Sequence, residues 1–320
     1  MKCLIRASLL TIAAAFFSAC NRTAAPSNSG SPAGAIRVSG AWALYPMMVA
    51  WAEAYQKLYP AVRIDISAGG AGKGLADALA GLADLGMVSR EIAPEETARG
   101  ACAVAVAKDA VMCIISAANP HADALVRRGI TKESCVGIWM TGTLKAWSNL
   151  VGGAAPEAIN VYTRSDAAGA PETWAKYLGG TQENLKGTGV YGDPGLAEAV
   201  KQDRCGIGYA NLNYAYDMTT GRPVNGVRVV PLDANGNGIA DPAEDISTKA
   251  KAVAAIAAHA YPSPPARDLY LVTKQRFSGV TAAFVRWILT DGQAMTGTAG
   301  YISPTPGQLA AAVALVSAAR

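Results

Sequence analysis

The sequence predicts an α/β protein in which mixed sheets are flanked by helices, and three observations support this. Short apolar runs typical of strands alternate with helical apolar patterns along most of the chain. At four places a loop containing glycine joins a strand pattern to a helix pattern. About 285 residues follow the N-terminal leader, which is enough for two lobes.

The N-terminal region is predicted to be a bacterial lipoprotein leader followed by a tether. Two basic residues precede an apolar run that is too short to span a bilayer. The run ends in FSAC (17–20), which is similar to a lipobox. We expect a signal peptide at 1–19, lipidation at Cys20 and a flexible tether at 20–35. An ordinary signal peptide is the alternative. The body would be held at a membrane, in the periplasm or at the cell surface.

The first strand is expected at 36–39. A loop follows it, and Tyr45 and Pro46 then open a helix, because proline suits the first helical positions. Parallel strands would place this loop beside the next one. Open α/β sheets bind ligands at this place, beyond the carboxyl ends of their strands.

Residues 67–90 (SAGGAGKGLADALAGLADLGMVSR) are expected to form a glycine-rich loop, a helix and a strand. Glycines at alternate positions allow positive φ and a close approach of the backbone to a ligand. The helix has apolar residues at i, i+4 and i+7, the last being Leu82. Its N-terminal amides can bind an anion, and Ser89 and Arg90 would lie beside them. A tight turn without a ligand is the alternative.

The glycine loop matches neither of two common nucleotide motifs. A P-loop requires Ser or Thr after Gly-Lys, and Gly74 stands there instead. The dinucleotide pattern GxGxxG requires glycine at Leu75. The loop therefore predicts neither nucleotide class.

Apolar periodicity and turn residues predict the remaining elements. Further strands are expected at 103–106, 111–116, 159–163, 205–209, 227–232 and 268–273. Further helices are expected after a cap at Thr131, through Trp174 and Leu178, and at 196–200, 252–258, 284–288 and 308–319. Residues 261–265 (YPSPP) are expected to form a rigid extended linker back to the first lobe.

Charge and composition exclude several functions. The net charge is +4 without a basic run, so a nucleic-acid partner is not expected. Two histidines are too few and too far apart for a zinc site or a catalytic base. Four cysteines follow the leader and permit two disulfides in three pairings. Cys102 and Cys113 could face one another on adjacent strands, with free thiols as the alternative.

Six segments together resemble one known family. They are SGAWALYPMMVAWAEAYQKLYP (39–60), GGAGKGLADALAGLADLGMVSREI (69–92), WMTGTLKAWSNL (139–150), RSDAAGAPETW (164–174), CGIGY (205–209) and RDLYLVTK (267–274). In this order they resemble the substrate-binding proteins of phosphate-specific ABC transporters. The resemblance implies a two-lobed type II periplasmic binding-protein fold with the ligand in the interlobe cleft. We expect lobe 1 at 36–113 plus 268–320 and lobe 2 at 114–267.

The resemblance also implies a ligand site made of loop residues from both lobes. Its members are Leu44, Tyr45, Ala71, Ser89, Arg90, Arg164, Asp166, Ala168, Gly169 and Ala170. Arginine pairs with an oxyanion in a bidentate geometry. A carboxylate accepts a hydrogen bond only from a protonated oxyanion, which would select phosphate over sulfate.

The site departs from the family pattern at several positions. The family's Ser-Gly-Thr is Ala168-Gly169-Ala170 here, Ala71 replaces a serine, and Arg90 stands where an aspartate is common. At least three hydroxyl donors are lost, each worth roughly 0.5–1.5 kcal/mol. Sulfate, molybdate, tungstate or a larger phosphorylated ligand therefore stay open. An interlobe ion pair is the alternative role for Arg90 and Asp166.

The resemblance implies a monomeric extracytoplasmic lipoprotein that captures an oxyanion, with phosphate favoured, and delivers it to an ABC permease. Alternatives are an anion-sensing lipoprotein and a phosphatase-type enzyme. The enzyme is disfavoured because no Ser-His-Asp set, histidine cluster or pair of catalytic carboxylates is recognisable. No cofactor is required.

A second motif predicts a structural Ca²⁺ site. Residues 233–244 (DANGNGIADPAE) fit the spacing of an EF-hand loop, although a strand precedes them. The oxygen ligands would come from Asp233, Asn235, Asn237, Ile239 (carbonyl), Asp241 and Glu244. A turn rich in Asp and Asn is the alternative.

Overall fold

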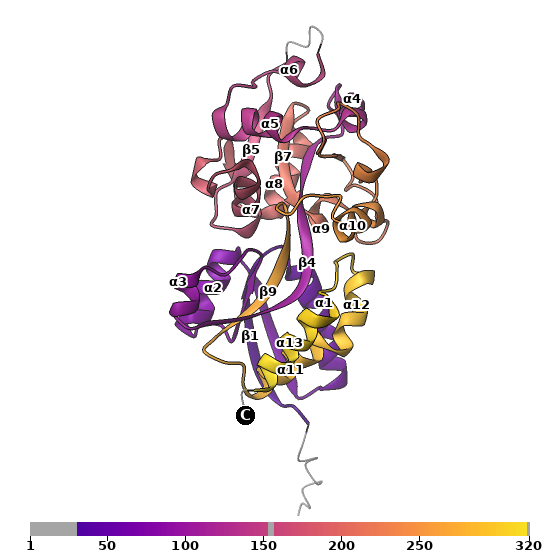
Figure 1. Cartoon of the computed structure of the whole chain (residues 1–320). Coiled ribbons are helices and arrows are strands. Elements are labelled where there is room, and N and C mark those ends of the chain that lie inside the picture. Colours follow the sequence, from indigo (N-terminus) through magenta and orange to yellow (C-terminus); the bar gives the residue numbers. More distant parts are fainter. Residues whose placement is uncertain (1–30, 153–156, 319–320) are drawn as a thin grey trace, which may run out of the picture. The chain divides into compact units, whose positions relative to one another are not determined.

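The computed structural model describes residues 31–152 and 157–318 (Figure 1). From Pro32 onward the chain forms one compact unit. The predicted signal peptide, the lipidation site Cys20 and most of the tether lie outside the described residues. Within the described ranges, no helix combines the length and apolar character needed to cross a bilayer.

The structure is a mixed α/β fold, as predicted. The described strands are β1 (Gly34–Gly40), β2 (Val62–Ala68), β3 (Leu85–Val88), β4 (Ala101–Ser116), β5 (Asn160–Arg164), β6 (Thr188–Val190), β7 (Gly206–Asn211), β8 (Val227–Val230) and β9 (Ala266–Lys274). The described α-helices are α1 (Tyr45–Leu58), α2 (Ala71–Ala80), α3 (Pro94–Ala98), α4 (Ala122–Arg128), α5 (Lys132–Cys135), α6 (Ser148–Val151), α7 (Gly169–Leu178), α8 (Gly192–Gln202), α9 (Leu212–Ala215), α10 (Lys249–Ala257), α11 (Gly279–Leu289), α12 (Ala294–Thr298) and α13 (Pro306–Ser317).

The strands pair in the order β2-β1-β3-β9-β4-β7-β5-β6, and β8 also pairs with β4. The pairs β1–β2, β1–β3, β5–β6 and β5–β7 are parallel, whereas β4 and β9 pair antiparallel with each other and with their other neighbours. Because β1, β2 and β5 are parallel to their neighbours, the loops that follow them open at the carboxyl ends of the strands.

Strands β4 and β9 lie side by side (Figure 1), and two hydrophobic cores pack against different parts of this pair. The first core comes from residues 36–107 and 269–316 and includes Trp51; the second comes from residues 110–266 and includes Trp139. The changeover falls inside both strands. Residues 111–113, which the sequence assigned to lobe 1, therefore belong to the second core. Movement of the cores as separate lobes stays a prediction.

Strand β4 corrects the prediction of two separate strands. Lys108 and Asp109 are polar, yet the ladder continues through them with only a bulge between Ala105 and Ala107. Their register partners on β9 are Asp268 and Arg267, so opposite charges pair across the strands. Cys102 and Cys113 lie on this same strand, so they cannot face one another from adjacent strands. All four described cysteines are free.

Two further expectations were wrong. Leu82 is 66% exposed because α2 ends at Ala80 and Gly81 takes a left-handed φ of 73°. Residues 261–265 include a turn with cis bonds before Pro264 and Pro265, rather than an extended linker. In contrast, Thr131 caps α5 as predicted, since its side chain accepts from the amide of Ser134.

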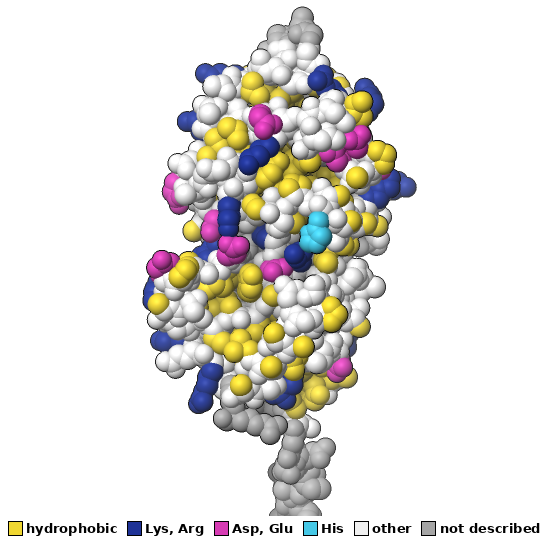
Figure 2. All heavy atoms as spheres, in the orientation of Figure 1, with side chains coloured by type: hydrophobic (Ala, Val, Ile, Leu, Met, Phe, Trp, Pro, Cys, Tyr) yellow, Lys and Arg dark blue, Asp and Glu magenta, His cyan; other side chains and the backbone are white. Residues whose placement is uncertain are grey.

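Acidic and basic side chains are interspersed on the face shown in Figure 2, without a large area of one sign. Near the middle of this face, basic and acidic groups lie next to each other.

Candidate ligand-binding site

Loops from the two cores meet at the place where the sequence puts a ligand. Gly169, at the start of α7, lies against Ser89, at the end of β3. The glycine loop before α2 lies against residues 166–168, and the amide of Gly72 donates to the carbonyl of Ala167 at 3.4 Å. The structure therefore brings together most of the predicted site.

Glycine is required at two of these contacts. A Cβ on Gly169 would lie deep inside van der Waals contact of both the hydroxyl and the carbonyl of Ser89. Gly70 has a φ of 91°, and a Cβ there would lie 2.7 Å from the carbonyl oxygen of Ala167. The two cores approach this closely only because side chains are absent at these positions.

Two helix N-termini supply backbone donors at this place. The amides of Ala71, Gly169 and Ala170 donate to no acceptor in the part of the chain that the structure describes. The amide of Ala168 differs, because it donates to the side chain of Gln182 at 3.3 Å. Unpaired amides at the start of ten-residue helices favour an anion.

The first predicted loop contributes differently from the expectation. The amides of Leu44 and Tyr45 donate to the carbonyls of Ala41 and Trp42 at 3.2 Å each, so both are engaged in local turns. The Leu44 side chain is buried in the first core. Trp42 in this loop contacts the second core instead, because its backbone carbonyl accepts a hydrogen bond from the hydroxyl of Tyr214 at 3.2 Å.

Arg164 is held by two carboxylates within the second core. Its guanidinium donates to Asp166 at 2.8 and 2.5 Å and to Asp193 at 2.5 Å. Burial opposes its charge most strongly, but the two carboxylates outweigh this effect and raise the pKa of Arg164. Arg164 is already paired with two carboxylates, and the formal charge of the three groups together is −1.

Arg90 is occupied by other groups. Its terminal nitrogens donate to the carboxylate of Glu96 at 2.8 and 2.7 Å, and its Nε lies 2.8 Å from Glu172 Oε2. Glu172 belongs to α7, so Arg90 forms an ion pair between the two cores. The sequence analysis gave an interlobe ion pair as the alternative role for Arg90 and Asp166. Arg90 does form an ion pair between the cores, with Glu172, whereas Asp166 pairs with Arg164 inside the second core.

The sequence analysis missed the partners of these arginines. Asp193 lies in one of the four predicted strand–loop–helix junctions and Asp109 lies between two predicted strands, but neither was predicted to pair with an arginine. Asp109 stands in an otherwise apolar run, and a buried charge of this kind requires a partner. That pattern could have identified it, but nothing local identifies Arg267 as the partner.

Arg267 connects β9 to the start of α7. Its Nε donates to Asp109 at 3.1 Å and a terminal nitrogen donates to the carbonyl of Gly169 at 2.7 Å, while the other contacts the side chain of Asn211. Asp109 Oδ2 has no hydrogen-bond partner among the described residues. Burial raises the pKa of Asp109 to about 6, although Arg267 opposes this shift.

The candidate calcium loop is closed by its own hydrogen bonds. The buried carboxylate of Asp233 accepts from the amides of residues 236–238 at 2.8–3.2 Å. Glu244 accepts from the amides of Ala234 and Asp241 at 2.8 and 3.1 Å. These bonds fold the loop tightly around Asp233.

The other candidate ligands contact one another. The side-chain amides of Asn235 and Asn237 donate to Asp241 Oδ2 at 2.7 and 3.0 Å, and Ile239 is 61% exposed. Among residues 31–152 and 157–318, no three His, Cys, Asp or Glu side chains are grouped so that they could hold a metal ion.

Comparisons with known proteins agree with this architecture. A family model described as a PBP superfamily domain matches residues 25–292. The phosphate-binding protein PstS of Bacillus subtilis is 28% identical over 70% of this chain and 74% of its own. A phosphate ABC transporter substrate-binding protein from Clostridium perfringens, solved with bound phosphate, has a TM-score of 0.69 at 23% identity, covering 85% of this chain and 100% of that chain.

An ABC-type phosphate transport receptor from Vibrio cholerae has a TM-score of 0.61 at 19% identity and covers 84% of this chain and 100% of its own. These likenesses confirm the type II periplasmic binding-protein fold that the resemblance implied. With a family match that spans most of its length, the chain belongs to the PBP superfamily.

Proposed function

We propose that this protein is an extracytoplasmic solute-binding lipoprotein that captures an oxyanion, with phosphate favoured, and delivers it to an ABC permease. One observation carries the proposal: two helix N-termini from different cores present unpaired amides beside the Ser89–Gly169 contact. The names of the relatives in Bacillus subtilis and Clostridium perfringens support phosphate as the ligand.

The charges at the site also favour phosphate over sulfate. Asp166 and Asp193 outnumber Arg164, so the local side-chain charge opposes an anion that only accepts hydrogen bonds. Phosphate at neutral pH carries a proton and can donate to a carboxylate, whereas sulfate cannot. Backbone amides then supply most of the attraction, and each is worth roughly 1.5–3 kcal/mol to a charged acceptor.

Isothermal titration calorimetry of the tag-free body tests the ligand. We expect phosphate to bind, and sulfate, molybdate and tungstate to bind at least tenfold more weakly, because none of these three carries a proton at neutral pH. Absence of heat with all four anions would contradict the proposal. Tighter binding of sulfate than of phosphate would keep the transport role but overturn the argument from the carboxylates.

Two other functions are separable by experiment. A phosphatase is disfavoured because no Ser-His-Asp set, histidine cluster or pair of catalytic carboxylates is recognisable in the sequence. Release of phosphate from a chromogenic phosphate ester would nevertheless establish an enzyme. Permease and ATPase genes next to the gene for this protein would support transport, whereas their absence would favour an anion sensor.

We further propose that lipidation of Cys20 holds a monomeric body at the membrane. Cys20→Ser should move the protein from the membrane fraction to the soluble fraction without changing anion affinity. A variant that stays with the membrane would rule out this anchor.

We also propose that the 233–244 loop binds a structural Ca²⁺. Support comes from the loop spacing and from the caging of Asp233 by three amides, which is typical of calcium loops. Binding requires the side chains of Asn235, Asn237 and Asp241 to turn from one another toward the ion. A chelator should lower the melting temperature and Ca²⁺ should restore it, whereas Asp241→Asn should weaken the response. A melting curve unaffected by either reagent would exclude the ion.

A further inference from the structure

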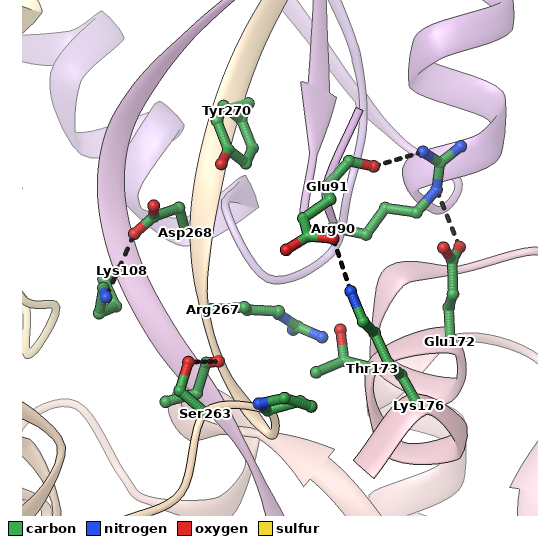
Figure 3. Close-up of a pocket in the computed structure, with 12 residues that line it drawn as sticks. Arg90, Glu91, Lys108, Glu172, Thr173, Lys176, Ser263, Arg267, Asp268 and Tyr270 are labelled. Atoms are coloured by element: carbon green, nitrogen blue, oxygen red, sulfur yellow. Dashed lines mark hydrogen bonds and ion pairs between the residues drawn. The ribbon is translucent and has the colours of Figure 1, made fainter. Parts of the chain in front are cut away.

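Two ion pairs join the segment after β3 to one face of α7 (Figure 3). Arg90 Nε lies 2.8 Å from Glu172, and Lys176 Nζ lies 2.5 Å from Glu91. Arg90 and Glu91 are consecutive and opposite in charge, and Glu172 and Lys176 lie one helical turn apart with the opposite order of charge. Both ion pairs therefore form together in only one position of α7 along the segment 90–91.

Contacts within the first core orient Arg90 independently of α7. Glu96 grips both terminal nitrogens of its guanidinium, and Glu96 also accepts from the amide of Ala93 at the start of α3. Burial opposes both charges, yet Glu96 raises the pKa of Arg90 and Arg90 lowers the pKa of Glu96. This pair lies within the first core, so the Nε group points toward Glu172 without needing the second core to orient it.

The two ion pairs differ in exposure. The side chains of Arg90 and Glu172 are 14% and 50% exposed, whereas those of Lys176 and Glu91 are 57% and 79% exposed. Exposed pairs contribute little and are screened by salt. The Arg90–Glu172 pair therefore dominates, and the second pair mainly disfavours other registers.

We propose that Arg90, Glu91, Glu172 and Lys176 are positioning residues that hold the start of α7 over Ser89 before a ligand binds. Glu172 is three residues after Gly169, so fixing it also fixes the unpaired amides of Gly169 and Ala170. A ligand then meets a site that is already partly assembled, which raises its apparent affinity. The inference rests on the proposed function, because these are the amides proposed to bind the oxyanion.

The four side chains line a cavity of about 170 Å³ that also contains Lys108, Arg267 and Tyr270 (Figure 3). In this view Lys176 and Glu172 rise from α7 toward Glu91 and Arg90 on the opposite side. The cations that line the cavity are matched by carboxylates, including Asp268 beside Lys108 at 3.4 Å. This balance is typical of a contact between protein surfaces rather than of a second anion site.

The double variant Glu172→Gln, Lys176→Gln tests the positioning role. Small-angle X-ray scattering of the ligand-free protein should show a larger radius of gyration than the parent, and added phosphate should reverse the change. Phosphate affinity should fall roughly three- to tenfold, because fewer molecules are assembled for binding. Glu198→Gln is the matched control, since Glu198 pairs with Lys201 within α8 and not between the cores.

Exchanging the charges of Glu91 and Lys176 distinguishes the loss of their ion pair from other effects of substituting these residues. Glu91→Lys alone should open the ligand-free protein less than the Glu172→Gln, Lys176→Gln double variant does, because it replaces the weaker pair by a contact between like charges. Adding Lys176→Glu should restore the parental scattering curve. Failure of the exchange to restore it, or a double variant that scatters and binds like the parent, would overturn the inference. If the parent binds no phosphate, the proposed function fails, and the ligand-free scattering still decides the role of the ion pairs.

Discussion

Arg164 and Arg90 were both assigned to the ligand by the same family resemblance, and the structure treats them in opposite ways. Arg164 is buried between Asp166 and Asp193, both from the second core. Arg90 is partly exposed, donates hydrogen bonds to Glu96 in its own core and forms an ion pair with Glu172 in the other. One arginine makes its contacts within a single core, and the other links the two cores.

The difference shows that the partners of an arginine decide its role. A buried guanidinium between two carboxylates cannot leave them without exposing charge to a low dielectric. A guanidinium at an interface can exchange its distant partner for water at a small free-energy cost. Substitutions at Arg164, at the contact between the cores and at the carboxylate beside Arg267 test this contrast.

The largest effect is expected for Arg164→Ala. The substitution leaves Asp166 and Asp193 without their cation and should lower the free energy of unfolding by about 3–5 kcal/mol. Arg90→Gln should lower it by only about 1 kcal/mol, because Arg90 is partly solvated. Urea unfolding followed by circular dichroism measures both. Equal losses would break the contrast between the two arginines.

Gly169→Ala should chiefly affect ligand binding. The new Cβ collides with Ser89 only when the cores are in contact, so the collision acts on closure more than on either core. Phosphate affinity should fall roughly five- to 150-fold, from an overpacking cost of about 1–3 kcal/mol. Gly307→Ala on α13 is the control, because its Cβ meets no atom within 4 Å. An unchanged affinity for Gly169→Ala would show that binding does not need this contact.

Asp109→Asn sharpens the comparison by removing the one carboxylate bound to Arg267. The pKa of Asp109 is about 6 in the folded chain and about 3.9 in an unfolded one, so the folded state binds more protons between these values. Its contribution to the free energy of unfolding therefore falls as pH rises from about 4 to 6, by up to about 3 kcal/mol. Urea titrations across this range should show a flatter pH dependence in the variant. Parallel curves would assign the slope to other groups.

Sequence reasoning predicted the order of the strand–loop–helix junctions and the loops that meet at the candidate site. These features depend on local signals, such as the glycines near Ala71 and the apolar stripe of α1. The contact with Ser89 explains the glycine at Gly169, which the sequence analysis named only as a ligand-site residue implied by the family resemblance.

Sequence reasoning did not predict which charged groups would pair. Asp193 lies 29 residues from Arg164, and Asp109 lies 158 residues from Arg267. No local pattern encodes such partners, since Asp109 meets Arg267 where β9 returns beside β4 and Asp193 meets Arg164 where α8 packs beside β5. The continuity of β4 through Lys108 and Asp109 was missed for the same reason, because the compensating charges are on a distant strand.

Strand β4 has a consequence for how the molecule unfolds. Val104 and Val106 belong to one hydrophobic cluster, and the stretch from Val111 to Ile115 belongs to the other. Unfolding of either cluster removes hydrogen-bond partners from the backbone of β4, and β4 also forms part of the other cluster. Denaturation should therefore be cooperative across the whole body, and an excised half would expose an unpaired strand edge prone to aggregation.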